Sequence, residues 1–321
     1  MRIQPSNSEH LRFITKVALM YHEEGIKQPQ IASDLGIPQA RVSRLLRRAT
    51  ELGIVKTLVV PPSELYTRLE REIARKYGLI DVVIADSIPG HEQTLLGAAA
   101  ATYLESVLFG DERLGISSWS SSLLATAEAL TSSHKKVATD VIQIIGGVGN
   151  PDAQASATRI ISRFAEITGG APRYLAAPGI LENKAVRDGL LRDPSIKEIV
   201  KSWGSLTTAL VGIGAVEPSP LLAQSGNSLT LIDQRNLIKA RAVGGVCLHY
   251  FDSNGFPVSS GHEDRLLGIS AATLKKVSRR IAIAGGIRKL PAIRAALLGG
   301  WVNVLVTDSQ IAAALMKDQG E

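Results

Sequence analysis

Amide, hydroxyl and basic side chains occur together in a short segment near residue 40, where their types suit contact with a nucleic-acid duplex. Gln and Arg can each make two hydrogen bonds to the edge of adenine or guanine, and the methyl of Ala can contact that of thymine. Further Arg side chains suit phosphates, which position a protein without reading the bases. The candidates for base or phosphate contact are Gln28, Gln39, Ala40, Arg41, Ser43, Arg44, Arg47 and Arg48.

A second set of polar and glycine residues follows short apolar runs in the larger C-terminal part of the chain. Hydroxyls and backbone N–H groups at the start of a helix suit an anion or a polyol, and glycine lets the backbone approach a ligand closely. These residues therefore predict a small-molecule site that draws on several strand ends. Its candidates are Ser117, Ser118, Ser120, Ser121, Ser122, Gly146, Gly147, Asn150, Asp252, Gly285, Gly286, Lys289 and Asp308.

Some of these candidates have a purely structural alternative. A helix N-cap with incidental serines also explains the serines of 117–122, a solvated surface position explains Lys289, and a turn explains Asp252. The single cysteine, Cys247, is expected to be a small buried apolar residue, because no histidine or second cysteine lies near it at metal-ligand spacing. We therefore expect no metal and no cofactor.

The basic segment is preceded by the helices needed to position it. Apolar residues of 10–24 recur at three- and four-residue spacing, and Gly25 follows where a C-terminal cap is expected. A short helix is predicted at 28–35 and, after a turn at 36–38, a third helix at about 39–52. This order is typical of a helix-turn-helix, whose last helix enters the major groove of DNA. An ordinary three-helix bundle with a basic surface is the alternative.

The pattern beyond residue 79 favours an α/β fold. Residues 54–60 resemble a strand or small wing, and 61–78 form a charged amphipathic helix that could connect two domains, which sets boundaries at 1–60, 61–78 and 79–321. Short apolar runs then alternate with helical stretches, which indicates a mainly parallel, Rossmann-like sheet covered by helices, with ligands bound beyond the carboxyl ends of strands. Strands are expected at 81–86, 113–117, 140–147, 208–215, 281–286 and 302–308.

Composition supports two domains and an anionic partner. The 321 residues are 45% hydrophobic and carry a net charge of +6, and residues 1–60 hold nine Lys and Arg against five Asp and Glu. A single cysteine allows no internal disulfide and indicates a reducing compartment. The sequence has no apolar run long enough for a membrane span and no secretion signal, so we expect a cytoplasmic protein without a membrane partner.

Ordered motifs over nearly the whole length resemble the SorC family of sugar-binding transcriptional regulators. They are carried by 28–55, 115–130, 141–150, 242–255, 265–270 and 281–308. The resemblance implies a winged helix-turn-helix domain joined to an effector domain of the NagB/RpiA-like sugar-isomerase fold. It also implies a homo-oligomer, dimer or tetramer, that binds palindromic operator DNA and controls carbohydrate genes, as repressor or activator, in response to a sugar, polyol or sugar phosphate. Lys289 matches the lysine that faces the effector.

Two departures from the family pattern bear on the effector. Where the family usually has glycine followed by Thr or Arg after the tryptophan, this chain has serines at 120–122 after Trp119, which leaves an unphosphorylated sugar or polyol open. Some relatives place a lysine before the first glycine pair to capture an aldehyde sugar as a Schiff base. The matching residues 143–145 contain none, so covalent capture is not expected.

Two other functions compete with a ligand-controlled regulator. A sugar-phosphate-processing enzyme with an appended DNA-binding domain would have the same fold, but catalysis needs a positioned acid and base, and none of the six histidines stands in a recognisable catalytic arrangement. We therefore expect no enzyme activity. A regulator whose sensing domain only oligomerises is the other alternative, and binding of sugars that raises thermal stability would distinguish it.

Overall fold

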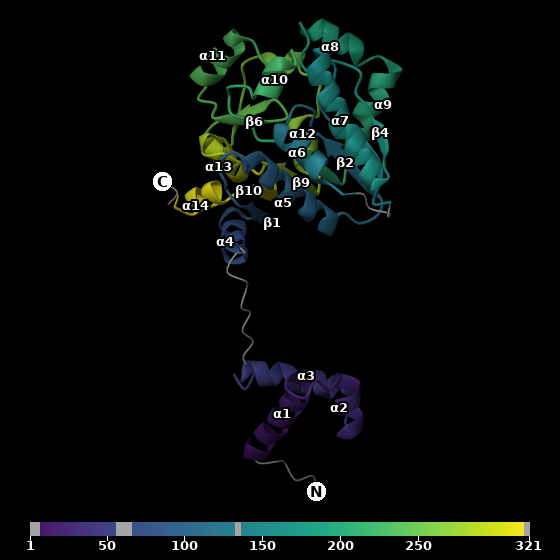
Figure 1. The fold of residues 1–321 in the computed structure, drawn as a ribbon, viewed down its shortest axis with the longest axis vertical. Helices are drawn as coiled ribbons and strands as arrows, with labels where there is room; N and C mark the ends of the chain where they lie inside the picture. The colour runs from purple at the N-terminus through teal and green to yellow at the C-terminus, as the bar shows by residue number, and fades with distance from the viewer. Residues whose placement is uncertain (1–6, 56–65, 132–135, 318–321) are drawn as a thin grey trace. The chain divides into compact units, whose positions relative to one another are not determined.

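The computed structural model describes residues 7–55, 66–131 and 136–317, and the chain divides into two compact units at residues 65 and 66 (Figure 1). The strand or wing expected at 54–60 lies, from residue 56 onward, outside the described residues, and so does the start of the helix expected at 61–78.

The smaller unit contains the three expected helices: α1 (Asn7–His22), α2 (Gln28–Asp34) and α3 (Gln39–Glu51). Their common core holds Ile14, Val17, Ile31 and Val42, none more than 1% exposed. Pro29 lies in the first turn of α2, where its missing N–H costs no helical hydrogen bond. The glycines that follow α1 and α2 have positive φ, as helix ends require.

The larger unit is built on a seven-stranded sheet in which every pair of neighbours is parallel. The strand order is β1-β10-β9-β5-β2-β3-β4, so the chain starts at one edge, moves to the other half and returns through the centre. A mainly parallel sheet was predicted, and it is confirmed. The strands are β1 (Asp81–Ala85), β2 (Glu112–Ile116), β3 (Ala138–Gln143), β4 (Ala171–Arg173), β5 (Thr208–Val211), β9 (Arg279–Ile283) and β10 (Val304–Asp308).

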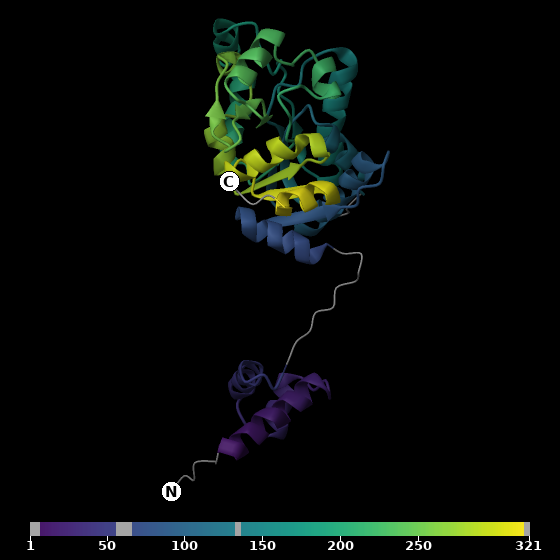
Figure 2. The ribbon, with the colours of Figure 1, turned by 90° about the vertical axis from the view of Figure 1, so that its left-hand side faces the viewer.

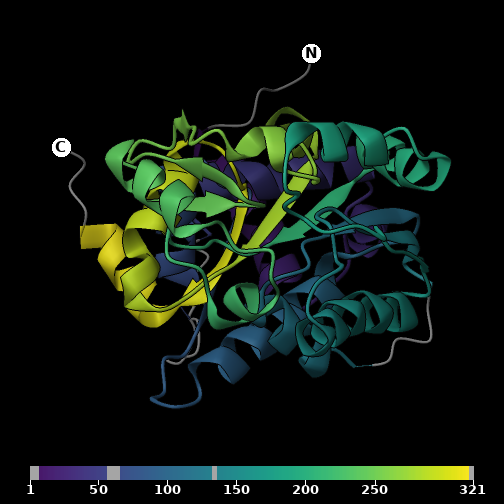
Figure 3. The same ribbon diagram turned by 90° about the horizontal axis from the view of Figure 1, so that it is seen from above.

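Helices cover both faces of this sheet, as Figure 3 shows from above, and form two hydrophobic cores. One face packs against α5 (Glu92–Val107), α6 (Ser121–Ala129) and most of α7 (Pro151–Thr168). The other packs against α4 (Thr67–Tyr77), α9 (Pro194–Ser202), α12 (Ala271–Lys276), α13 (Leu290–Leu298) and α14 (Ser309–Lys317). The remaining helices are α8 (Lys184–Leu190), α10 (Pro220–Gln224), α11 (Leu231–Lys239) and the short 3₁₀ turns η1 (Trp203–Ser205), η2 (His262–Arg265) and η3 (Ile287–Lys289).

A small antiparallel sheet was not foreseen. Its strands, β6 (Gly244–Val246), β7 (His249–Phe251) and β8 (Pro257–Val258), are two or three residues long and too short to leave an alternating pattern. An isolated bridge between Gly214 and Gly245 joins this sheet to the loop that follows β5. The small sheet therefore lies against the carboxyl end of the main one.

Helix α4, expected as part of a connecting helix, packs on the larger unit. It contacts β1 and α14, beside which it lies in Figure 2, and its Ile73 is fully buried. The backbone N–H of Ile84 donates to Glu70 Oε1 over 2.9 Å, and the Tyr66 hydroxyl donates to Asp86 Oδ1 over 2.7 Å. The Glu70 carboxylate thus accepts from an N–H on β1, which is an edge strand of the sheet formed by the described residues, and burial raises the pKa of Glu70.

Helices α5 and α6 approach so closely that a methyl group cannot fit between them at Gly97. A Cβ there would lie 2.7 Å from the backbone carbonyl carbon of Ala125. Gly97→Ala should therefore destabilise the protein by about 1–3 kcal/mol through overpacking. Gly189→Ala, also within a helix but in open space, should stabilise it by about 0.5–1 kcal/mol. Urea unfolding of the two variants would check this, and equal effects would contradict the packing argument.

Candidate functional site

A cavity of about 580 Å³ opens at the carboxyl ends of three adjacent strands, β2, β5 and β9. Each strand contributes the loop that follows it: residues 117–122 after β2, 212–219 after β5 and 288–289 after β9. The hairpin of β6 and β7 adds a fourth wall with Cys247, Leu248 and Tyr250. This is the edge at which parallel α/β sheets bind ligands, because successive loops diverge there and leave a crevice.

The serine-rich turn after β2 divides into residues that line the cavity and one that supports it. Ser117, Ser120, Ser121 and Ser122 line it, and Ser120 also caps α6 by accepting the N–H of Leu123 over 3.3 Å. The capping alternative and a lining position thus coexist at Ser120. The hydroxyls and the free N–H groups of the first turn of α6 form a wall suited to oxygen-rich ligands.

Ser118 is buried behind this wall. Its Oγ donates to the carbonyl of Ile145 over 2.9 Å and accepts from Gln143 Nε2 over 2.8 Å. The Gln143 side chain also accepts from the N–H of Leu175 over 2.8 Å. This network ties together the loops that follow β2, β3 and β4, so Ser118 holds the site in shape and does not line the cavity.

The first glycine pair serves close packing of the chain. A Cβ on Gly146 would lie 2.3 Å from the carbonyl carbon of Pro178, and one on Gly147 would lie 2.0 Å from Gln143 Nε2. Neither glycine lines the cavity. Asn150 also lies outside its wall, where its Nδ2 donates to the carbonyl of Gln224 over 2.7 Å and joins the start of α7 to the end of α10.

Two cations lie side by side where the chain leaves β9. Lys289 is half-buried and Arg288 is exposed, and among the described residues neither side chain has a hydrogen-bond or ion-pair partner. Burial lowers the pKa of Lys289, and the neighbouring Arg288 charge lowers it further. An anion in the cavity would offset both effects, because it would stabilise the charged ammonium.

The remaining predicted residues shape turns around the cavity. Asp308 is buried, and its Oδ2 accepts the N–H of Gly286 over 2.6 Å while its Oδ1 accepts that of Ile311 over 2.8 Å, so one carboxylate fixes the turn before Lys289 and caps α14. Gly285 lies against the same carboxylate. Asp252 accepts the N–H groups of Asn254 and Phe256 in the β7–β8 turn, away from the cavity wall, as the turn alternative predicts.

Several residues that line the cavity were not predicted from the sequence. Glu217 and Ser219 follow β5, a strand that was predicted, so the strand-end rule could have identified them. Gln93 follows β1 in the same way. Cys247 lies in a turn and Tyr250 on a strand of the small antiparallel sheet, for which the sequence carried no recognisable signal.

Helix α3 of the smaller unit has one buried and one basic face. Val42, Leu45, Leu46 and Ala49 point into the core. The opposite side is exposed along its length and carries Gln39, Ala40, Arg41, Ser43, Arg44, Arg47 and Arg48. Of these, Arg48 pairs with Glu51 over 2.9 Å. Gln28, the first residue of α2, is half-buried.

A helix-turn-helix with a basic exposed helix, followed by an α/β unit whose cavity is lined by hydroxyl and cationic groups, defines a DNA-binding regulator with a ligand-binding domain. Residues 62–317 match the family model described as "Putative sugar-binding domain". The chain belongs to the SorC family of sugar-binding transcriptional regulators, as its motifs indicated.

Relatives cover almost the whole chain. The deoxyribonucleoside regulator of Bacillus subtilis strain 168 is 31% identical over 306 residues, which span 94% of this chain and 96% of the relative. The sorbitol operon regulator of Klebsiella pneumoniae is 30% identical over 97% of this chain and 99% of its own length. The crystal structure of the full-length sorbitol operon regulator from that organism has a TM-score of 0.72 at 27% identity and covers 98% of this chain and 100% of the other.

Two further findings concern the described residues only. Within 7–55, 66–131 and 136–317, no helix combines the length and the apolar character needed to cross a lipid bilayer. The same residues contain no group of three or more His, Cys, Asp or Glu side chains that could hold a metal ion.

Lys289→Met should weaken binding of a sugar phosphate such as D-glucitol 6-phosphate roughly tenfold to a hundredfold, because a charge-assisted hydrogen bond is lost. In the unchanged protein, binding of the sugar phosphate should weaken as the pH rises through the lowered pKa of Lys289, because the ammonium that binds the phosphate loses its proton. Calorimetric titration from about pH 7 upward, where the phosphate stays dianionic, would measure both effects. Lys197→Met, at an exposed position on α9, is the control, and an unchanged pH profile in Lys289→Met would contradict the assignment.

Proposed function

We propose that this protein binds operator DNA through α3 and that a sugar, polyol or sugar phosphate in the cavity changes that binding. The observation that carries the ligand half of the proposal is a pair of cations, Arg288 and Lys289, that line one cavity together with the serine turn and have no hydrogen-bond or ion-pair partner among the described residues. Burial opposes the charge of Lys289, and a partly buried charge in a cavity is typical of a group that meets a ligand.

The cavity chemistry favours a phosphorylated sugar or polyol. The two cations suit an anionic group, whereas Glu217, Gln93 and the serine hydroxyls suit the hydroxyls of a carbon chain. Its volume of about 580 Å³ lies within the range usual for small-molecule sites. An unphosphorylated polyol is the second candidate, because the serine turn lacks the glycine followed by Thr or Arg that is usual in the family.

The names of the relatives support an operon-level role. One is named a deoxyribonucleoside regulator and another a sorbitol operon regulator; a deoxyribonucleoside contains a sugar, and sorbitol is a polyol. By analogy, this chain regulates transcription of genes for carbohydrate use, and its place of action is the cytoplasm, where the DNA is.

A homo-oligomer, dimer or tetramer, is proposed as the DNA-binding form. Two copies of α3 related by a two-fold axis would read two half-sites, so the operator would be palindromic, with half-sites spaced to match the two helices. A ligand would change operator binding only if it bound one arrangement of the oligomer more tightly than the other.

Sensing is favoured over turnover. Among the described residues that line the cavity, Glu217 is the one carboxylate and none is a histidine, so the side chain most often used in general acid–base catalysis is absent from the wall. Incubation with a panel of sugar phosphates would test this point, since steady product formation would require an enzyme.

Arg44→Ala should weaken binding to the operator by about 1–3 kcal/mol and relax base preference at one position, whereas Arg47→Ala should weaken all duplexes alike and lower the salt slope by about one. Fluorescence anisotropy on duplexes from the region upstream of the gene, over a range of salt concentrations, would measure both. Arg192→Ala, exposed on the larger unit, is the control. If neither α3 variant differed from it, the DNA-binding role of α3 would be wrong.

A further inference from the structure

The turn between β6 and β7 consists of two residues with left-handed backbone. Val246 pairs with His249, so Cys247 and Leu248 form a two-residue turn, and their φ angles are 52° and 63°. Hairpin turns of this kind need positive φ at both positions and usually contain Asn and Gly, because side chains with a Cβ are disfavoured there. The turn is therefore strained, and something must hold it.

This strained turn forms part of the cavity wall. Cys247 and Leu248 both line the cavity and are only 6% and 7% exposed. The wall that they form would move away from the ligand if the turn relaxed to another conformation. Strain that persists at a binding site requires support from the surrounding structure.

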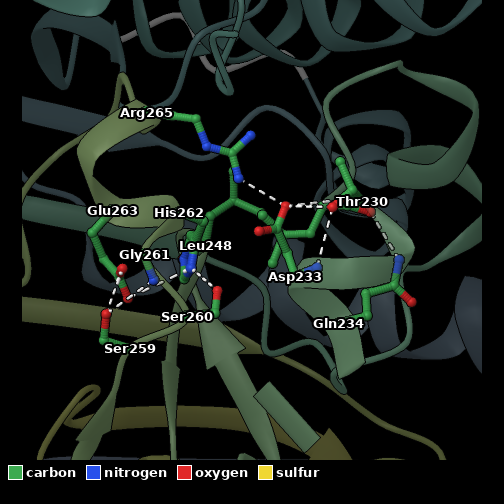
Figure 4. Close-up of polar contacts among 11 residues, drawn as sticks. Thr230, Asp233, Gln234, Leu248, Ser259, Ser260, Gly261, His262, Glu263 and Arg265 are labelled. Atoms are coloured by element: carbon green, nitrogen blue, oxygen red, sulfur yellow. Dashed lines mark hydrogen bonds and ion pairs between the residues drawn. The ribbon is translucent and has the colours of Figure 1, made fainter. Parts of the chain in front are cut away.

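The support is a buried histidine behind the turn. His262 has no exposed surface, and its Nε2 lies 2.8 Å from the carbonyl oxygen of Leu248 (Figure 4). A carbonyl only accepts, so Nε2 carries the proton and donates. On the other side of the ring, Nδ1 lies 2.7 Å from the hydroxyl of Ser260, which donates to Nδ1 when the ring is neutral. Both ring nitrogens are used, which fixes the orientation of the imidazole.

His262 is itself held in place from two directions. The ring of Tyr250 packs edge-on against it with 5.5 Å between centroids. In the same 3₁₀ turn, Arg265 Nη2 lies 2.7 Å from Asp233 Oδ2, and Asp233 forms the capping box of α11 with Thr230 (Figure 4). The donor that reaches Leu248 is thus anchored to the folded body of the larger unit.

We propose that His262 is a positioning residue for the effector site: its hydrogen bond to Leu248 keeps the strained Cys247–Leu248 turn in the form that closes the cavity wall. The inference rests on the proposed function only for the identity of the occupant. It assigns a role in shaping the site to a residue outside the cavity wall, because His262 is not among the residues that line the cavity.

The chain contains a built-in reporter for this turn. Cys247 is its single cysteine, and burial raises the pKa of the thiol to about 12. Reaction with dithiobis(nitrobenzoate) proceeds by attack of the thiolate on the reagent disulfide and releases one coloured thionitrobenzoate for each thiol. The rate of release from the full-length protein therefore reports how accessible Cys247 is, and opening of the turn raises it.

His262→Leu should speed thiol modification about tenfold, since local opening no longer has to break a buried hydrogen bond. His262→Gln, whose amide also donates, should stay closer to the unchanged protein. Trp203→Phe is the matched control, because it removes another buried N–H bond to a carbonyl, that of Gln143, away from the turn. An equal rise in Trp203→Phe, or no rise in His262→Leu, would overturn the proposal.

A double-variant comparison distinguishes loss of support at the turn from general loosening of the fold. Leu248→Gly removes the conformational demand at one of the two turn positions, the one whose carbonyl His262 holds, because glycine adopts positive φ freely. In that background, His262→Leu should change the thiol rate much less than in the unchanged protein, and an equally large change would overturn the positioning role. Protection of Cys247 by D-glucitol 6-phosphate, compared with inorganic phosphate, tests the proposed function separately, since the rates measured without any addition do not depend on it.

Discussion

Parallel alignment of β9, β5 and β2 is the constraint on which the cavity depends. Parallel strands bring all their carboxyl ends to one edge, so loops that lie far apart in the sequence, at 117–122, 212–219 and 288–289, converge on the same space. The two layers of helices make this possible, because each parallel connection must cross a face of the sheet before the next strand begins.

Within that frame, polar groups fall into two classes with different partners. Ser118, Gln143 and Asp308 spend their hydrogen bonds on other parts of the chain and have almost no exposed surface. Arg288 and Lys289 have no such partner within the part of the chain that the structure describes, and burial acts against the charge of Lys289. The first class stabilises the loops, and the second is left to interact with whatever enters.

The sequence was informative wherever burial left a pattern. Strands such as β5 and β10 are buried along their whole length, so they appear as apolar runs that could be predicted. The edge strand β4 is exposed, and β6–β8 are too short to show any periodicity. Tertiary contacts determine where β4 and β6–β8 form, and the local sequence carries no propensity that would predict these strands.

The candidate site was also predictable only in part, since some of its features depend on tertiary contacts. Some of the residues expected at strand ends line one cavity, but glycines such as Gly146, which packs on Pro178, and glycines that approach a ligand look identical in a sequence. The difference depends on what lies across the gap, which is a chain segment some thirty residues away. The support of the β6–β7 turn by His262 was equally invisible, since fourteen residues separate donor and acceptor.

Separation of the wall from its framework has a consequence for how such proteins diversify. If the cavity binds the effector as proposed, exchanges at Ser121, Glu217 or Arg288 would alter what it accepts without removing a hydrogen bond between loops, because none of these side chains bonds to another described residue. Selectivity can therefore drift by single substitutions while the scaffold is inherited intact, which suits a lineage whose members include both a deoxyribonucleoside regulator and a sorbitol operon regulator.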